Sequence, residues 1–166
     1  MNMVICIATI YNEKNEMKNI WDLFSESKGQ PIAYGGRVLV RADKLLIGKQ
    51  PRILRYKIIS TDSDWRQGIS FRTNGIIRYH GNEIKKGWAD IWENEMPRED
   101  IVECKSKDGV LWVKNIWDEG RGGTESWNNG AAMWLEEIPN GRRYYCNDGH
   151  FDDDMNNIIF ELTIGS

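Results

Sequence analysis

The stretch CNDGHFDDDMNNIIFELTIGS, residues 146 to 166, decides the fold. Its last third alternates strictly, with apolar side chains at every second position. These apolar residues are Ile158, Phe160, Leu162 and Ile164. A period of two residues predicts a β-strand that buries one face. Four aspartates and three asparagines crowd into residues 147 to 157, directly before this strand. We therefore expect a loop whose carboxylates repel one another unless something neutralises them.

The rest of the chain repeats this pattern of short β-like runs between turn residues. Examples are RILRYKIIS at 52 to 60, GVLWVKNIW at 109 to 117 and GRRYYCN at 141 to 147. The spacing leaves no room for helical crossovers between parallel strands. We expect a single all-β domain over residues 1 to 166, an antiparallel jelly-roll-like β-sandwich of roughly eight to ten strands.

Local signals add turns, a helix and a first strand. Asn74-Gly75 and Asp108-Gly109 each lie between two β-like runs, which predicts two-residue hairpin turns. Apolar residues at helical spacing predict one short N-terminal helix across residues 13 to 25: Met17, Ile20, Trp21 and Phe24. Residues 1 to 10, MNMVICIATI, predict a first strand and not a signal peptide, because no basic residue precedes the apolar run.

Composition limits the classes of partner. A net charge of −3 and a pI near 5.5 argue against general nucleic-acid binding. No run reaches the roughly 20 apolar residues of a membrane helix, so we expect no membrane insertion. Cys6, Cys104 and Cys146 lack CxxC spacing, which predicts buried free thiols. We expect a protein that is cytoplasmic or is released without a classical signal peptide.

The charges are distributed unevenly along the chain. Residues 99 to 166 carry fourteen acidic and six basic side chains, whereas residues 1 to 98 carry eleven and sixteen. The acidic part contains the aspartate-rich loop. This asymmetry fits either a patchy surface or a site for a cation or a partner.

The loop has the side chains of a calcium site. Asp152, Asp154 and Asn156 form D-x-D-x-N, with Asp148 before them and Asn157 after. Calcium takes six to eight oxygen ligands from carboxylates, amides and carbonyls. A strand follows where an EF-hand has a helix, so the loop is not an EF-hand. The alternative is a solvated acidic turn whose side chains bond their own backbone.

The end of the chain resembles the calcium-dependent galactose-binding lectins of bacteria and related carbohydrate-binding β-sandwiches. The resemblance covers about twenty residues: an Asn-Asp pair ending one strand, a short loop, two asparagines and a final alternating strand. It implies that the ion is held by Asp148, the carbonyl of Asp152, Asn156 and Asn157, and that the ion binds two sugar hydroxyls. The loop here is one residue longer and has two extra carboxylates.

A glycine-rich loop with aromatic flanks is the second candidate site. In WDEGRGGTESWNNGAAMW, residues 117 to 134, Trp127 lies among polar side chains. Indole faces stack on sugar rings while carboxylates and amides bind hydroxyls. The expected ligand-binding residues are Trp127, Asn128, Asn129, Glu125 and Asp118, together with His150 from the acidic loop. Trp117 ends an alternating strand, and we expect it to fold inward.

A third stretch, KKGWADIWENE at 85 to 95, places Trp88, Asp90 and Trp92 on one face if it is a strand. That face is either core, with Asp90 hydrogen-bonded, or a binding platform.

The leading hypothesis is a calcium-dependent carbohydrate-binding protein, a lectin-like module that recognises a carbohydrate or glycoconjugate and is not an enzyme. The alternative is a protein-interaction or self-assembly module with a structural calcium site. Homo-oligomerisation fits both, since multivalency strengthens weak single sites. A third hypothesis is a small hydrolase that uses two carboxylates of one cleft.

Overall fold

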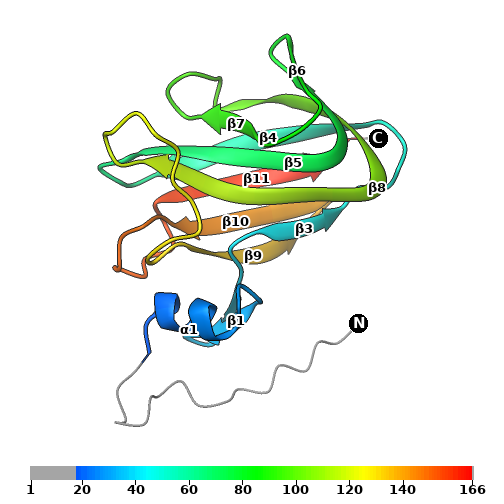
Figure 1. The fold of residues 1–166 in the computed structure, drawn as a ribbon. Helices are drawn as coiled ribbons and strands as arrows, with labels where there is room; N and C mark the ends of the chain where they lie inside the picture. The colour runs from blue at the N-terminus through cyan, green and yellow to red at the C-terminus, as the bar shows by residue number, and fades with distance from the viewer. Residues whose placement is uncertain (1–17, 166) are drawn as a thin grey trace.

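The computed structural model describes residues 18–165. Within this range the chain forms one α-helix and eleven β-strands (Figure 1). The elements are α1 (Ile20–Glu26), β1 (Ile32–Tyr34), β2 (Arg37–Leu39), β3 (Asp43–Leu46), β4 (Arg52–Thr61), β5 (Arg66–Tyr79), β6 (Asn82–Ile84), β7 (Ala89–Trp92), β8 (Glu99–Asp118), β9 (Ala132–Ile138), β10 (Gly141–Asn147) and β11 (Ile158–Ile164). The predicted all-β class with a short N-terminal helix is confirmed.

Nine strands form one antiparallel sheet in the order β6-β5-β8-β4-β11-β10-β9, with β3 pairing to β8 and β7 pairing to β5. The final strand β11 is central, between β4 and β10. Its alternation is as the sequence predicts, because Ile158, Phe160 and Leu162 are fully buried while Ile159 and Glu161 are half-buried.

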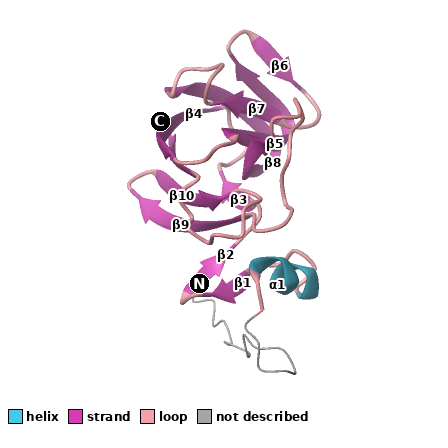
Figure 2. Cartoon of the chain, turned by 90° about the vertical axis from the view of Figure 1, so that its left-hand side faces the viewer, coloured by secondary structure: helices cyan, strands magenta, loops and turns pink. Residues whose placement is uncertain are grey.

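Two long strands, β5 and β8, bend in the middle and divide the sheet into two parts. The register between them shifts after Thr73, which pairs with Leu111, to Gly75, which pairs with Ser106. Beyond the bend, β8 changes its outer partner from β4 to β3. Strands that bend at bulges are a known way of making the corners of a β-sandwich. Figure 2 shows the sheet curving around its interior.

The predicted hairpins at Asn74-Gly75 and Asp108-Gly109 are wrong. Both dipeptides lie inside β5 and β8, at the bend where the register shifts. At Gly75 a Cβ atom would lie only 1.9 Å from the Lys105 carbonyl oxygen, so the close approach of the two backbones requires glycine here. The same residue types that favour a tight turn also permit a bulge.

One main core lies between the two parts of the sheet. It joins Ile69, Phe71 and Val113 from one part to Tyr56 and Phe160 from the other. Cys104 and Cys146 are buried free thiols, as predicted. Cys6 and the predicted strand at residues 1 to 10 lie outside the described residues.

A smaller core lies under α1 and the β1–β2 hairpin. Asn19 caps the helix, its side chain accepting a hydrogen bond from the Asp22 amide at 2.9 Å. Ile20 and Phe24 are buried, while Trp21 is 43% exposed. The helix begins at Ile20, and residues 13 to 17 of the predicted span lie outside the described part. Between residues 18 and 165 no helix is long and apolar enough to cross a membrane.

Candidate functional site

The predicted metal ligand Asp148 lies inside the protein, at the end of β10. Its carboxylate is fully buried and accepts hydrogen bonds from Ser63 Oγ at 2.6 Å, Gln67 Nε2 at 3.0 Å and the His150 backbone amide at 3.0 Å. The His150 ring nitrogen Nδ1 lies 2.7 Å from the same carboxylate. A buried carboxylate needs such partners, and here both oxygens have them.

The two asparagines of the predicted site tie the loop to its surroundings. Asn157 is buried, its Oδ1 accepting from the Asp148 amide at 2.9 Å and its Nδ2 donating to the Asp62 carbonyl at 2.9 Å. Asn156 donates weakly to the Asp62 carboxylate, at 3.5 Å, while its Oδ1 is buried without a hydrogen-bond partner. Of these two amide oxygens, that of Asn157 is hydrogen-bonded and that of Asn156 is buried and unpaired.

The three consecutive aspartates lie on the surface. Asp152, Asp153 and Asp154 are exposed, and Asp153 accepts a hydrogen bond from the Tyr34 hydroxyl at 2.5 Å. In residues 18–165 no group of three or more acidic, histidine or cysteine side chains is placed to hold a metal ion. With Asp148 and Asn157 bonded to protein groups, the residues do not fit the ligand set that the lectin resemblance implies. Calcium binding by this loop stays a prediction.

His150 belongs to a separate small cluster. Its ring stacks on Trp65, with centroids 3.8 Å apart and an interplanar angle of 23°. The Asp148 contact orients the ring, and 38% of the side chain remains exposed. His150 is thus held at the surface by a buried carboxylate and an indole, and not by the predicted ligand residues of the 118–129 loop.

The start of the glycine-rich loop is structural. Trp117 is fully buried, as predicted. The Asp118 carboxylate accepts hydrogen bonds from the amides of Gly120, Arg121 and Gly122 at 2.9 to 3.1 Å, and Arg66 approaches it at 3.4 Å. Burial raises the pKa of Asp118, but these hydrogen bonds and the Arg66 charge together lower it. Asp118 therefore closes a turn.

The middle of the loop returns to the strand that precedes it. Glu125 forms two backbone hydrogen bonds with Trp117, and its carboxylate accepts from Asn128 Nδ2 at 3.0 Å. Two of the five predicted residues of this loop, Glu125 and Asn128, thus bond each other.

Arg41 fixes the part of the loop that contains Trp127. Its guanidinium donates to the carbonyls of Trp127 at 2.7 Å, Asn129 at 3.0 Å and Ala131 at 3.2 Å. The Trp127 indole N–H donates back to the Arg41 carbonyl at 2.9 Å. Trp127 and Asn129 both have positive φ angles, 58° and 47°, which non-glycine residues rarely adopt. These contacts hold the Trp127 ring in place at the surface.

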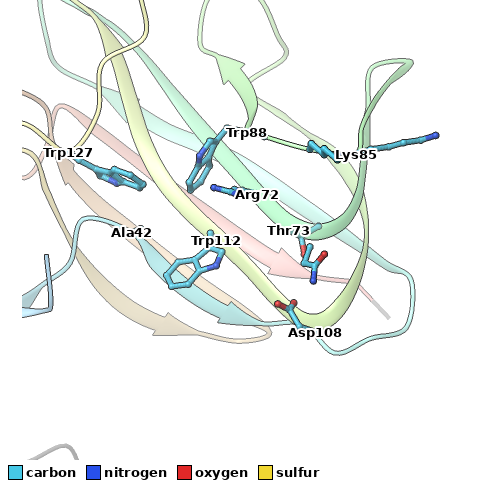
Figure 3. A pocket seen from close by; sticks show the side chains of 11 residues that line it. Ala42, Arg72, Thr73, Lys85, Trp88, Asp108, Trp112 and Trp127 are labelled. Carbon is cyan, nitrogen blue, oxygen red and sulfur yellow. The ribbon is translucent and has the colours of Figure 1, made fainter.

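Trp127 lines a pocket of about 630 Å³ together with two further tryptophans, Trp88 and Trp112 (Figure 3). We call it the tryptophan pocket; Arg72 and Lys86 also line it. Trp88 precedes β7 and Trp112 lies on β8, so three separate segments supply the rings. A second pocket of about 790 Å³ shares Ala42, Trp112 and Trp127 with the first, so the two meet at these residues.

The indoles are not buried in the core. Trp112 is 40% exposed and Trp127 44% exposed. Trp88 and Trp127 meet edge to face, with centroids 5.8 Å apart and planes at 80°. Large aromatic side chains gathered at an open surface indicate a binding site.

Lys114 lies beneath two of these rings. Its Nζ is 4.0 Å from the Trp88 centroid and 4.3 Å from the Trp127 centroid, and it bonds Ser126 Oγ at 3.1 Å. Burial lowers its pKa; Asp90 raises it and the Arg72 charge lowers it further. A cation held between two indoles fixes their orientation.

The stretch at residues 85 to 95 contributes partly to the core and partly to the binding surface. Trp92 is buried, and Asp90 accepts a hydrogen bond from Ser70 Oγ at 2.5 Å, as expected of core. Trp88 lines the tryptophan pocket, as expected of a binding platform.

Of the residues around the tryptophan pocket, the sequence predicts Trp127 as a ligand-binding residue and leaves Trp88 as either core or platform. It does not single out Trp112, Arg72 or Lys114. The alternation of Trp112 and Lys114 on one face of a strand was the available signal. Arg72 becomes a neighbour of Trp112 only through the pairing of β5 with β8, which no local pattern predicts.

Comparison with protein-family models, with curated proteins and with solved structures found no match, so the lectin resemblance stays a prediction.

Proposed function

We propose that the protein binds carbohydrate, with the sugar in the tryptophan pocket. The observation that carries the proposal is the convergence of Trp88, Trp112 and Trp127 on one open pocket. Pyranose rings present apolar C–H faces that stack on indoles, and polar groups at the rim bind hydroxyls. The volume of about 630 Å³ is within the usual range for ligand pockets.

The pocket is held in shape without a ligand. Arg41 bonds the backbone around Trp127, and Lys114 lies between the rings of Trp88 and Trp127. A preformed site loses less conformational entropy on binding, which favours recognition of a weakly binding ligand such as a sugar. The adjoining second pocket supports an extended saccharide over a single ring.

The test is a titration with oligosaccharides and polysaccharides, followed by intrinsic tryptophan fluorescence. Trp112→Ala removes a ring that is 40% exposed and lines both pockets. We expect affinity to fall by about 30-fold or more, since truncating a central tryptophan typically costs at least ~2 kcal/mol. Leu46→Ala is the control, because Leu46 is 71% exposed and lines neither pocket. If Trp112→Ala binds as tightly as the wild type, the proposed site is wrong.

Calcium dependence is a separable part of the proposal. The resemblance predicts that the ion bridges protein and sugar, whereas the tryptophan pocket needs no ion. Each titration is therefore run in calcium and in chelator. Binding that disappears with chelator supports the lectin mechanism, and binding that persists supports the pocket alone.

The self-assembly alternative is favoured by one observation. Ile53, Ile59 and Ile101 are exposed on strands β4 and β8, between 39% and 46%. This face would be covered in an oligomer. Ile101→Glu should dissociate such an oligomer in sedimentation experiments and leave sugar binding intact, while a monomeric wild type would contradict self-assembly.

A further inference from the structure

The charges around the tryptophan pocket extend the proposed function, on which this inference rests. Trp112 has a cation on each neighbouring strand. Arg72 of β5 pairs with it on one side, and Lys44 of β3 pairs with it on the other. Side chains directly opposite one another on an antiparallel sheet lie on the same face. The exposed indole is therefore flanked by two positive charges.

Arg72, Lys44 and Lys86 form no salt bridge in the described part of the chain, although the Lys44 charge contributes to lowering the pKa of Asp108. Ion pairs there involve Arg66, Arg142 and Arg143, but not Arg72, Lys44 or Lys86. All three are exposed. Their charge is available to a ligand.

The two carboxylates nearest the pocket, Asp108 and Asp90, accept hydrogen bonds from protein groups. Asp108 lies at the far end of the pocket from Trp88 (Figure 3) and accepts from Ser106 Oγ at 2.8 Å and the Val110 amide at 3.1 Å. Asp90 is bonded to Ser70. Arg72, Lys85 and Lys86 line the tryptophan pocket with one acidic side chain, Asp108, and Lys44 lines the adjoining second pocket. The net charge of the protein is −3. The local excess of positive charge is thus opposite in sign to the whole molecule.

We infer that the ligand of the tryptophan pocket is an anionic saccharide, in which one ring stacks on Trp112 while a carboxylate or sulfate group binds between Arg72 and Lys44. A guanidinium forms paired hydrogen bonds with planar oxyanions, and lysine adds a point charge. The buried Lys114 ammonium adds to the positive field, with Arg72 close enough to influence it. An anion in the pocket relieves the repulsion among these cations.

Single-stranded nucleic acid also combines negative charge with stacking faces. The observations favour a saccharide, because the cations gather at one pocket of about 630 Å³. A protein that binds single-stranded nucleic acid needs a basic groove that follows the phosphate backbone over several nucleotides. Nucleic acid is therefore an outcome of the test.

The experiment compares ligands that differ only in charge. Polygalacturonate is titrated against its methyl ester, and dextran sulfate against dextran, in chelator and at two salt concentrations. We expect the wild type to prefer each charged polymer by about 10-fold or more, the range of a charge-assisted hydrogen bond. The preference should shrink at high salt. In the Arg72→Gln variant, the ratio of affinities for the charged and the neutral polymer should fall close to one, while weak binding of dextran remains.

Arg78→Gln is the matched control on the same strand. Arg78 is exposed, pairs with Glu83 and lines a different pocket. Equal binding of charged and neutral polymers overturns the inference but leaves the proposed function standing. Binding of none of the four overturns both. Tighter binding of a single-stranded oligonucleotide than of every polysaccharide assigns the pocket to nucleic acid and also overturns both.

Discussion

The Tyr144 hydroxyl on β10 donates a hydrogen bond to the Asp43 carboxylate on β3 at 2.7 Å, across the core between strands that do not pair. Both residues are buried. Arg142 approaches the same carboxylate, its Nη1 lying 2.8 Å from each oxygen. This contact joins the two parts of the bent sheet, and Asp43 and Arg142 line the second pocket.

Replacing Tyr144 with Phe should lower the free energy of unfolding by about 1.5 to 3 kcal/mol, the usual contribution of a hydrogen bond to a charged group. Urea denaturation measures the change. Tyr145→Phe is the control, because its hydroxyl makes a longer, half-buried contact with Glu136 at 3.2 Å. If the two variants lower the free energy of unfolding equally, the contact between Tyr144 and Asp43 stabilises the protein no more than the contact between Tyr145 and Glu136 does.

Gly75→Ala should disrupt the bend in β5. A Cβ atom there would lie 1.9 Å from the Lys105 carbonyl oxygen, so the strands must separate. We expect the free energy of unfolding to fall by several kcal/mol, or the protein to fail to fold, as measured by circular dichroism and thermal melting. Gly123→Ala, in a loop with no atom within 4 Å of the new methyl group, should leave the melting temperature unchanged. A stable Gly75→Ala protein would mean that the bend does not depend on this close approach.

The calcium prediction is tested by thermal melting in millimolar calcium and in chelator. An ion that binds only the folded state, at 100 times its dissociation constant, adds about 2.7 kcal/mol and raises the melting temperature by several degrees. Asp154→Ala should abolish that rise. If the wild-type melting curves in calcium and in chelator coincide, residues 148 to 157 form a loop that is held by its hydrogen bonds and not by an ion.

The cysteines of the core should not react with thiol reagents. Burial raises the pKa of Cys104 to about 12 and that of Cys146 well above its ordinary value. Because the thiolate is the reactive form, we expect the Cys6→Ser variant to show no labelling at pH 8 until urea is added. Rapid labelling of the folded variant would mean that the core opens readily.

The same thiols predict a loss of stability at alkaline pH. The unfolded state releases a thiol proton near pH 9, whereas folded Cys104 keeps its proton until about 12. The unfolded state therefore binds fewer protons in this window, and stability falls as pH rises. Each thiol contributes up to roughly 1.4 kcal/mol per pH unit. Cys104→Ala should show a shallower decline between about pH 9 and 11 in urea titrations, and an unchanged slope would contradict this assignment.

Local pattern was enough to predict β11, because the period of Ile158 to Ile164 depends only on neighbouring residues. It was not enough at Gly75. Asn-Gly suits both a hairpin and a bulge, and the distant pairing of Thr73 with Leu111 selects the bulge.

At the candidate site, too, local sequence pattern does not reveal contacts between residues that are distant in the sequence. Asp148 has the chemistry of a metal ligand, but its partners Ser63 and Gln67 come from more than eighty residues away in sequence. Arg72 and Trp112 are forty residues apart, and only strand pairing makes them neighbours. Trp127 could be predicted because a tryptophan among serine and asparagine has no nearby apolar surface to cover.

Arg41 connects two regions that the sequence separates. Its guanidinium lies 4.5 Å from the ring centroid of Phe24 on α1, while its hydrogen bonds hold the backbone around Trp127. We therefore expect docking of α1 and the shape of the tryptophan pocket to be thermodynamically coupled. On that expectation, a ligand that tightens the pocket would strengthen the attachment of α1, and displacing α1 would weaken ligand binding by the same factor.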